Sequence, residues 1–184
     1  MGDPRKLKKK YKTPFHPWKK ERIEKEREIL KEYGLKNKKE IWRAESKLKK
    51  YTRQAKRLIK GIGKQTEIER KQMISSLNRL NLIAENAKPE DVLNFGIKNI
   101  LNRRLQSFVC RLGLARSMKQ ARQFITHGHI FVNGKKINVP SYIIKKDEED
   151  KITFNPSSSL SSQEHSERSL KEEKKETVKE EPKE

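Results

Sequence analysis

The sequence RRLQSFVCRLGLARSMKQARQFITHGHIFVNGKKINVP, which runs from residue 103 to residue 140, decides the fold of this chain. Apolar residues recur at helical spacing from Leu101 to Leu112, and Gly113 can end that helix in the left-handed conformation. The opposite face of the helix is expected to be unpacked and cationic, because it carries Arg103, Arg104, Ser107 and Arg111.

A second helix and a hairpin follow. Ser117 and Gln120 have the spacing of a capping box, and Gly128 is a natural C-terminal stop. Asn133-Gly134 lies between β-prone residues and predicts a type I′ turn, which needs positive φ at both central residues. A helix pair joined so closely to a hairpin predicts a small α+β module.

Two further strands are expected at 142–144 and 152–154, joined by an acidic turn at 147–150. The predicted fold class is therefore α+β, with two helices packed on a short antiparallel β-sheet over residues 101–154. A module with one packed face and one cationic face suits a phosphate backbone better than a small-molecule substrate.

The order of residues in this module resembles a known family. The patterns RRLQ, GLARS, QAR, GHI, VNG and PSY are similar to the S-four RNA-binding fold. The segments MGDPRKLKKKYKTPFHPW (1–18) and YGLKNKKEIWRAESKLKKYTRQAKRLI (33–59) resemble the N-terminal part of archaeal-type members of the universal S-four family of small-subunit ribosomal proteins. The resemblance covers about residues 1–154.

This resemblance implies a structural constituent of the small ribosomal subunit and a primary binder of its ribosomal RNA. It implies a multi-helix RNA junction as the target, bound early so that the protein nucleates subunit assembly, close to the path by which mRNA enters. It also implies neighbouring small-subunit proteins as partners and a monomer within the ribosome. Some bacterial relatives carry a cysteine cluster for zinc near the N-terminus. This chain has one cysteine, Cys110, so no metal or other cofactor is expected.

The composition points the same way. The chain has 184 residues, with 46 Lys and Arg against 25 Asp and Glu, a net charge of +21 and a pI near 10.0. Such a charge opposes compaction in isolation and suits a polyanionic partner. A membrane is not expected, because no apolar run approaches the roughly 18 residues of a spanning helix and no signal-peptide core is present. The cytoplasm is the expected compartment.

The charge is concentrated in the N-terminal part. Residues 1–60 hold 23 Lys and Arg and 8 Asp and Glu, a net +15, whereas residues 155–184 hold 6 and 8, a net −2. This distribution and the hydrophobic pattern predict a basic extended arm at 1–17, a mainly helical basic domain at 18–100, the S-four module at 101–154 and a disordered charged tail at 155–184.

Within the helical domain, one helix is expected from Trp18 to Gly34, a second ending near Gly61, a third from a Thr66–Glu69 capping box, and a short one after Pro89. At helical spacing, Trp18, Tyr33, Trp42 and Tyr51 are expected to pack in a core. For the arm residues Tyr11 and Phe15, packing and stacking on RNA bases remain equally open.

No residues here have the pattern of a catalytic centre. Gly61-Ile62-Gly63-Lys64 lacks the spacing of a phosphate-binding P-loop. Cys110 is expected to be a small half-buried residue, and His127 with His129 is weak evidence for a metal because no Cys or carboxylate is near. The chain is therefore expected not to be an enzyme.

The residues expected to contact RNA are cations and polar side chains of three regions. In the N-terminal part they are Lys8, Lys9, Lys10, Arg43, Lys47, Arg53 and Arg57. In the two module helices they are Arg103, Arg104, Arg116, Ser117, Lys119, Gln120, Arg122 and Gln123. At the hairpin they are Lys135, Lys136, Ser141 and Tyr142.

Three other functions remain open: an RNA-modifying or tRNA-charging enzyme with an accessory module, a processing factor of pre-ribosomal particles, and a heat-shock or stalled-subunit binder. The first needs a large catalytic domain, for which no segment here is long or apolar enough. The third type is usually shorter and lacks the N-terminal helices. The second is distinguished from a ribosomal protein mainly by the archaeal-type sequence of residues 1–60.

Overall fold

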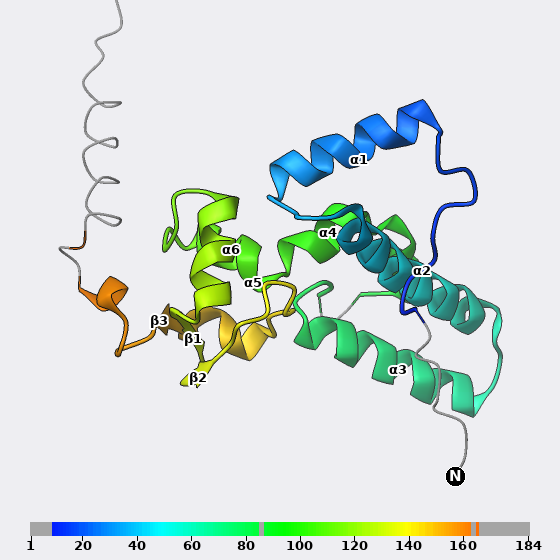
Figure 1. The fold of residues 1–184 in the computed structure, drawn as a ribbon. Coiled ribbons are helices and arrows are strands. Elements are labelled where there is room, and N and C mark those ends of the chain that lie inside the picture. Colours follow the sequence, from blue (N-terminus) through cyan, green and yellow to red (C-terminus); the bar gives the residue numbers. More distant parts are fainter. Residues whose placement is uncertain (1–8, 85–86, 163–164, 166–184) are drawn as a thin grey trace, which may run out of the picture. The chain divides into compact units, whose positions relative to one another are not determined.

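The structure, a computed structural model, describes residues 9–84, 87–162 and 165 (Figure 1). It divides between Leu101 and Asn102 into two units, each with its own apolar core. The first unit is helical and the second combines helices with a small sheet, so the predicted α+β class is confirmed. None of the described helices is both long and apolar enough to cross a membrane.

In residues 9–84 and 87–102, the structure shows four α-helices and one 3₁₀-helix. These elements are α1 (Lys20–Glu32), α2 (Lys38–Lys60), α3 (Lys64–Arg79), η1 (Pro89–Asn94) and α4 (Ile97–Asn102). The helices predicted to end near residues 34 and 61 and the short helix after residue 89 are confirmed.

The start of α3 differs from the predicted capping box. The carbonyl oxygen of Gly63 accepts hydrogen bonds from the backbone N–H groups of Thr66 (3.1 Å) and Glu67 (3.3 Å), so the helix begins before Thr66. The carboxylate of Glu69 instead accepts a hydrogen bond from the Arg57 guanidinium at 2.8 Å. This bond lowers the pKa of Glu69 and joins α3 to α2.

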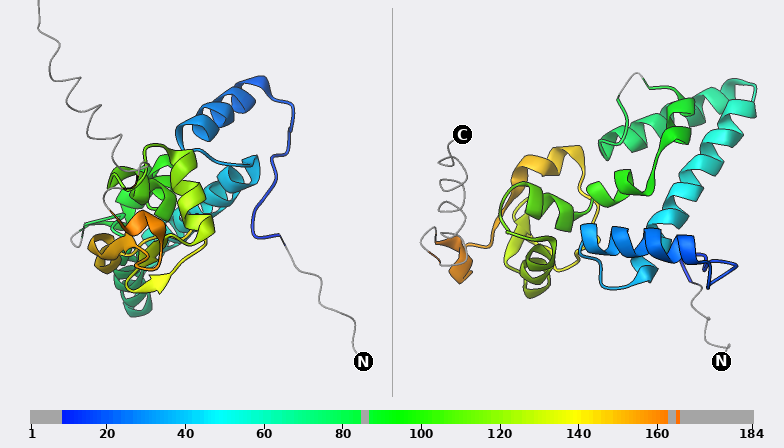
Figure 2. Two further views of the ribbon diagram at one scale, coloured as in Figure 1. Left: turned by 60° about the vertical axis from the view of Figure 1, so that its left-hand side comes forward. Right: turned by 90° about the horizontal axis from the view of Figure 1, so that it is seen from above.

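Helix α2 packs into both apolar clusters of the first unit. Its N-terminal half contributes Ile41 and Ala44 to one cluster, and its C-terminal half contributes Ala55 and Leu58 to the other. In the first cluster these side chains meet Tyr33, which is buried as predicted. Figure 2 shows the helices of this unit from two further sides.

A buried carboxylate joins α1 to α2. Glu26, only 6% exposed, accepts a hydrogen bond from the indole N–H of Trp42 at 3.0 Å. The same carboxylate forms ion pairs with Arg22 (3.3 Å) and Lys38 (3.4 Å). A buried charge is tolerated only when it is paired and hydrogen-bonded, so this cluster fixes the contact between the two helices.

Over the described residues, the second unit combines two α-helices and two short 3₁₀-helices with a three-stranded sheet. Its elements are α5 (Leu105–Arg111), α6 (Met118–His127), β1 (Ile130–Val132), β2 (Lys135–Lys136), η2 (Lys146–Lys151), β3 (Ile152–Phe154) and η3 (Ser159–Ser161). The sheet is antiparallel with the order β2-β1-β3, and its central strand pairs Phe131 with both Lys136 and Thr153.

The hairpin turn has the backbone that its residues predict. Asn133 and Gly134 have φ values of 51° and 72°, positive at both positions as a type I′ turn requires. The helices α5 and α6 pack against each other and the sheet through one core, which includes Leu105, Val109 and Ile125.

The first predicted helix of this unit is interrupted. Helix α4 ends at Asn102, and Arg104 is extended, with φ −77° and ψ 146°, before α5 begins. The backbone here bonds instead to residues 142–144: Ile144 donates to Arg103 at 3.0 Å, and Leu105 donates to Tyr142 at 2.8 Å. The strand expected at 142–144 is thus reduced to a single bridge between Arg104 and Ile143.

The described fold of the second unit extends past the predicted tail boundary at residue 155. The backbone N–H of Asn155 donates to His129 at 2.8 Å, and Leu160 is buried in the core of the unit. The remainder of the predicted disordered tail, residues 163–164 and 166–184, lies outside the described residues.

Candidate nucleic-acid interface

The N-terminus of α6 is held by reciprocal side-chain bonds. The hydroxyl of Ser117 accepts a hydrogen bond from the backbone N–H of Gln120 at 3.2 Å, as the capping box predicts. The Gln120 side-chain oxygen accepts from the backbone N–H of Arg116 at 2.8 Å, one residue earlier than in the standard motif. The two bonds fix the direction in which the chain enters the helix.

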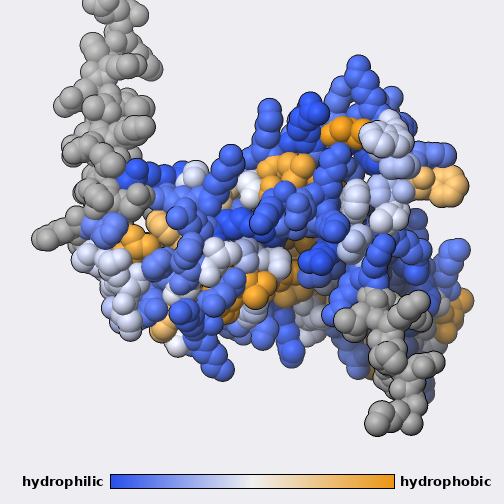
Figure 3. Space-filling view, viewed as in Figure 1, coloured by the Kyte–Doolittle hydropathy of each residue, from blue (hydrophilic) through white to orange (hydrophobic). Residues whose placement is uncertain are grey.

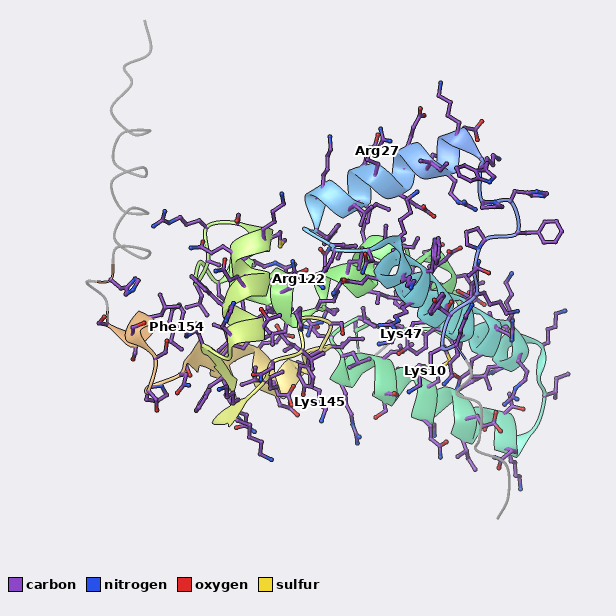
Figure 4. All side chains as sticks on the ribbon, viewed as in Figure 1. Lys10, Arg27, Lys47, Arg122, Lys145 and Phe154 are labelled. Atoms are coloured by element: carbon purple, nitrogen blue, oxygen red, sulfur yellow. The ribbon has the colours of Figure 1, made fainter. Side chains whose placement is uncertain are left out.

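Helix α6 presents the cationic face that the sequence predicts. Ala121, Phe124 and Ile125 are buried in the core, whereas Lys119 and Gln123 are exposed and Arg122 is half-buried. Figure 4 labels Arg122 on this helix. With Arg116 exposed before the cap, α6 offers a rigid set of donors that do not pack in the core.

The hairpin adds two exposed lysines, Lys135 and Lys136, on β2. The side chain of Lys136 lies across the C-terminus of α6, since a Cβ atom built on Gly128 would lie 2.0 Å from its Cε and 2.8 Å from its Nζ. A cation at a helix C-terminus complements the helix dipole. The Lys136 ammonium thus has a structural role in addition to any contact with RNA.

Beyond the hairpin, Ser141 is exposed, but Tyr142 is half-buried and engaged within the unit. Its hydroxyl donates to the carboxylate of Glu148, with oxygen distances of 3.0 and 2.9 Å. Burial, and then the Glu148 carboxylate, raise the pKa of Tyr142. The hydroxyl proton is therefore used within the unit.

Two arginines do not lie on an exposed cationic face, contrary to the sequence prediction. Arg103 is 7% exposed and Arg104 is 5% exposed. The Arg103 guanidinium donates to the carbonyl oxygen of Ile144 at 3.2 Å, pairs with the carboxylate of Glu149, and lies 4.8 Å from the ring centroid of Phe108. Burial follows from the break between α4 and α5, which turns both residues toward the segment at 142–144.

The expected RNA-binding residues of the first unit lie on the arm and on α2. Lys8 falls outside the described residues, and the others are exposed: Lys9, Lys10, Arg43, Lys47, Arg53 and Arg57. Figure 4 labels Lys10 and Lys47 beside α2. Arg57 is engaged with Glu69 at 2.8 Å, so its charge is partly compensated.

The arm is attached to α2, and Tyr11, for which packing and stacking were equally open, packs against this helix. The ring of Tyr11 packs 6.1 Å from that of Trp42 and lies 5.8 Å from the Arg43 guanidinium. The backbone N–H of Lys12 donates to the hydroxyl of Ser46 at 3.1 Å. These contacts join residues more than 30 positions apart, which no local pattern can predict. Helix α1 adds a basic residue absent from the expected set, the exposed Arg27 labelled in Figure 4.

One aromatic prediction is wrong. Tyr33 is buried and Trp42 and Tyr51 are half-buried, but Trp18, also expected in a core, is 88% exposed. Helix α1 begins two residues later, at Lys20, so Trp18 lies in the preceding loop and outside the helical repeat.

Neither histidine of the pair at 127 and 129 is part of a metal-binding cluster within the described ranges, where no three His, Cys, Asp or Glu side chains could hold an ion. Instead, Nδ1 of His129 lies 2.7 Å from the Ser158 hydroxyl. Burial, and then the charges of His127 and Lys136, lower the pKa of His129.

The exposed surface matches the composition. In the face shown in Figure 3, hydrophilic residues predominate and apolar residues form only small separate areas. Exposed cationic side chains occur on both described units. In the first unit they lie on the arm and on α2, and in the second they lie on α6 and β2.

Known proteins match both the second unit and the chain as a whole. The family described as the S4 domain matches residues 103–150. Small ribosomal subunit protein uS4 of Methanococcus aeolicus is 53% identical over 169 residues, which cover 91% of this chain and 96% of that protein. The uS4 protein of Methanothermobacter thermautotrophicus is 49% identical over 163 residues, 89% of this chain and 95% of that protein. The uS4 protein of Methanococcus maripaludis is 50% identical over 169 residues, which cover 91% of this chain and 95% of that protein. Identity of this level along nearly the whole length of each relative leaves one assignment: the chain belongs to the family of small ribosomal subunit protein uS4.

Proposed function

We propose that this chain is a structural protein of the small ribosomal subunit and that it binds the RNA of that subunit. The observation that carries this proposal is the exposed cationic face of α6, held by the Ser117 cap within the segment that matches the S4 domain. The curated relatives bear the name of a small-subunit ribosomal protein, which supports the same role.

The binding mechanism follows from charge and shape. Lysines and arginines on the arm, α2, α6 and β2 neutralise phosphates and release counterions, so affinity falls steeply with salt. The deep, narrow major groove of A-form RNA excludes side chains, so specificity comes from the shape of a folded target. We propose a multi-helix junction as that target, because cations on two separate units fit several helices better than one.

Finer roles follow from this proposal. Binding through RNA shape suits a protein that joins the junction early, nucleates assembly and lies near the path by which mRNA enters the subunit. We propose that it acts as a monomer among neighbouring small-subunit proteins, in the cytoplasm, and that it is not an enzyme. The bonds of Tyr142 and Arg103 to Glu148 and Glu149 support a structural part for these two side chains within the second unit.

In this proposal, Arg103 and Arg104 stabilise the fold and do not contact RNA directly. Both are buried, so they shape the second unit and leave the phosphate contacts to Arg116, Lys119 and Arg122. Among the other expected residues, Ser117 and Gln120 act first through the helix cap.

Sucrose-gradient sedimentation of a lysate that contains the tagged full chain tests the proposal. Protein in stoichiometric amount in mature small subunits is the expected result. Protein confined to precursor particles would instead identify a processing factor. In parallel, the purified chain is titrated with a small-subunit RNA transcript at about 50 and 200 mM salt. If it contacts roughly 6–10 phosphates, affinity falls about 10³- to 10⁵-fold between these concentrations.

A further inference from the structure

Two aromatic side chains of the first unit are almost fully exposed. Phe15 is 90% exposed and Trp18 is 88% exposed. Aromatic rings of this size are normally among the largest contributors to cores and interfaces. By comparison, Trp42 of the same unit packs against Tyr11 and donates its indole N–H to Glu26. Phe15 and Trp18 thus have no part in the core of the first unit, and another role must account for them.

The loop that carries these rings is attached at both ends. On one side, the backbone N–H of Lys12 donates to the Ser46 hydroxyl on α2 at 3.1 Å. On the other, the Arg22 guanidinium of α1 donates to the carbonyl oxygen of Pro17 at 2.8 Å. Pro14 and Pro17 further restrict the backbone between these points. The two rings are therefore presented by a short segment with fixed ends.

Several lysines lie close in sequence to the two rings. Lys9, Lys10 and Lys12 are exposed before them, and none of the ion pairs among the described residues involves these three lysines. Lys19 and Lys20 follow, with acidic neighbours at 3.4 and 4.0 Å. The imidazole of His16 packs edge-on against Phe15, with a centroid distance of 4.6 Å.

From this arrangement we propose that Phe15 and Trp18 stack on unpaired RNA bases while the adjacent lysines contact the phosphates. Interleaved aromatic and cationic groups are how proteins bind single-stranded RNA, because every base has a π-face and every nucleotide a charge. A protein partner fits less well, since lysine is depleted in protein–protein interfaces. The inference rests on the proposed RNA-binding function and extends it to an unpaired segment of that RNA.

The full-length chain with single substitutions tests this assignment. The probes are a 12-nucleotide oligoadenylate and an RNA duplex of 12 base pairs, and binding is measured by fluorescence anisotropy. Trp18→Ala and Phe15→Ala are each expected to weaken oligoadenylate binding by roughly 5- to 100-fold. Affinity for the duplex, whose bases are paired and held within the double helix, is expected to stay within about twofold of the unsubstituted chain.

Three controls separate stacking from other causes. Ile62→Ala removes another fully exposed apolar side chain of the same unit, 99% exposed, and is expected to change neither affinity. Trp18→Phe keeps a π-face and retains most of the affinity, whereas Trp18→Leu keeps only apolar area and does not. Lys10→Ala lowers the slope of log affinity against log salt by about 0.7 for the single strand, whereas the ring substitutions leave that slope unchanged.

Each contrary result has a distinct meaning. If the unsubstituted chain binds RNA with a steep salt dependence and Trp18→Ala and Phe15→Ala bind oligoadenylate with the same affinity as that chain, the stacking assignment is overturned. The proposed function is then unaffected. Equal losses on single strand and duplex would also overturn the stacking assignment. If the ring variants bind RNA normally but fail to enter small subunits, the rings meet a neighbouring protein. Absence of salt-dependent RNA binding by the unsubstituted chain would refute the proposed function itself.

Discussion

The guanidinium of Arg103, in the break between α4 and α5, pairs with the carboxylate of Glu149 in η2. The side chains of the two residues are 8% and 24% exposed, and they come from positions 46 apart in the sequence. This pair joins the acidic turn to the segment before α5 and uses within the fold a cation that the sequence pattern had placed among the expected RNA contacts.

Arg103→Ala is expected to lower the free energy of unfolding by about 2–4 kcal/mol, because it leaves the partly buried Glu149 without this cation. Urea denaturation followed by circular dichroism gives the value. The double variant Arg103→Met with Glu149→Leu removes both charges and is expected to be more stable than Arg103→Ala. If Arg103→Ala kept full stability but lost RNA affinity, a direct contact with RNA would replace this interpretation.

Lys119 on α6 is expected to contact a phosphate, and Lys145 is not. Lys119→Ala should weaken binding to a small-subunit RNA transcript and lower the salt slope by about 1, as the loss of one phosphate contact does. Lys145 is a matched control, because it is also exposed but lies beside the acidic turn, 4.0 Å from Glu148. Equal effects of the two substitutions would exclude the α6 face as a specific binding surface. The combination of Lys119→Ala with Arg122→Ala should enlarge the loss.

Stability is expected to fall as the pH drops below about 6.5, in part because of His129. Burial and neighbouring positive charges lower its pKa below the ordinary value of 6.5, so the unfolded chain binds the proton more readily. The contribution of neutral His129 to the free energy of unfolding is fully present above pH 6.5. It is lost as the pH falls from 6.5 through the pKa that His129 has in the folded chain. His129→Gln should reduce this slope in urea unfolding between about pH 5 and 8. His127→Gln, which removes a neighbouring charge, should reduce it less, and a steeper slope in His129→Gln would contradict the assignment.

Gly128→Ala is expected to destabilise the second unit through two separable effects. The φ of Gly128 is +78°, where a Cβ atom costs about 1–2 kcal/mol. The added Cβ would also collide with the Lys136 side chain. Adding Lys136→Ala removes the collision and leaves the backbone cost, so the double variant should recover only part of the lost stability in thermal unfolding. Full recovery would show that the backbone is not strained.

Features that depend on neighbouring residues could be predicted from the sequence. The Asn133-Gly134 turn and the Ser117 cap need only two to four adjacent residues, and both have the expected geometry. The apolar face of α6 likewise follows from helical spacing alone. The same spacing is sufficient to place Lys119 and Gln123 on the exposed side of α6, opposite its buried residues.

Features that depend on residues far apart in the sequence could not be predicted. The break at Arg103 arises from bonds to residues about 40 positions later, so a continuous helical repeat wrongly placed its charge on the surface. The predicted box at Thr66 had the right residue types, but the Thr66 N–H that the Glu69 side chain would accept donates instead to the carbonyl oxygen of Gly63. The exposure of Trp18 reflects a loop attached to two helices, which spacing within one helix cannot reveal.

The strand β2 has a further consequence for the protein before it reaches its subunit. It lies at the edge of the described sheet, where it pairs with β1, and it consists of Lys135 and Lys136. A second chain that added its own β2 to this edge would bring two further lysines against these two, at a strand too short to offset the repulsion. The same pair of charges that is proposed to meet RNA therefore protects a newly made, still unassembled chain against edge-to-edge aggregation.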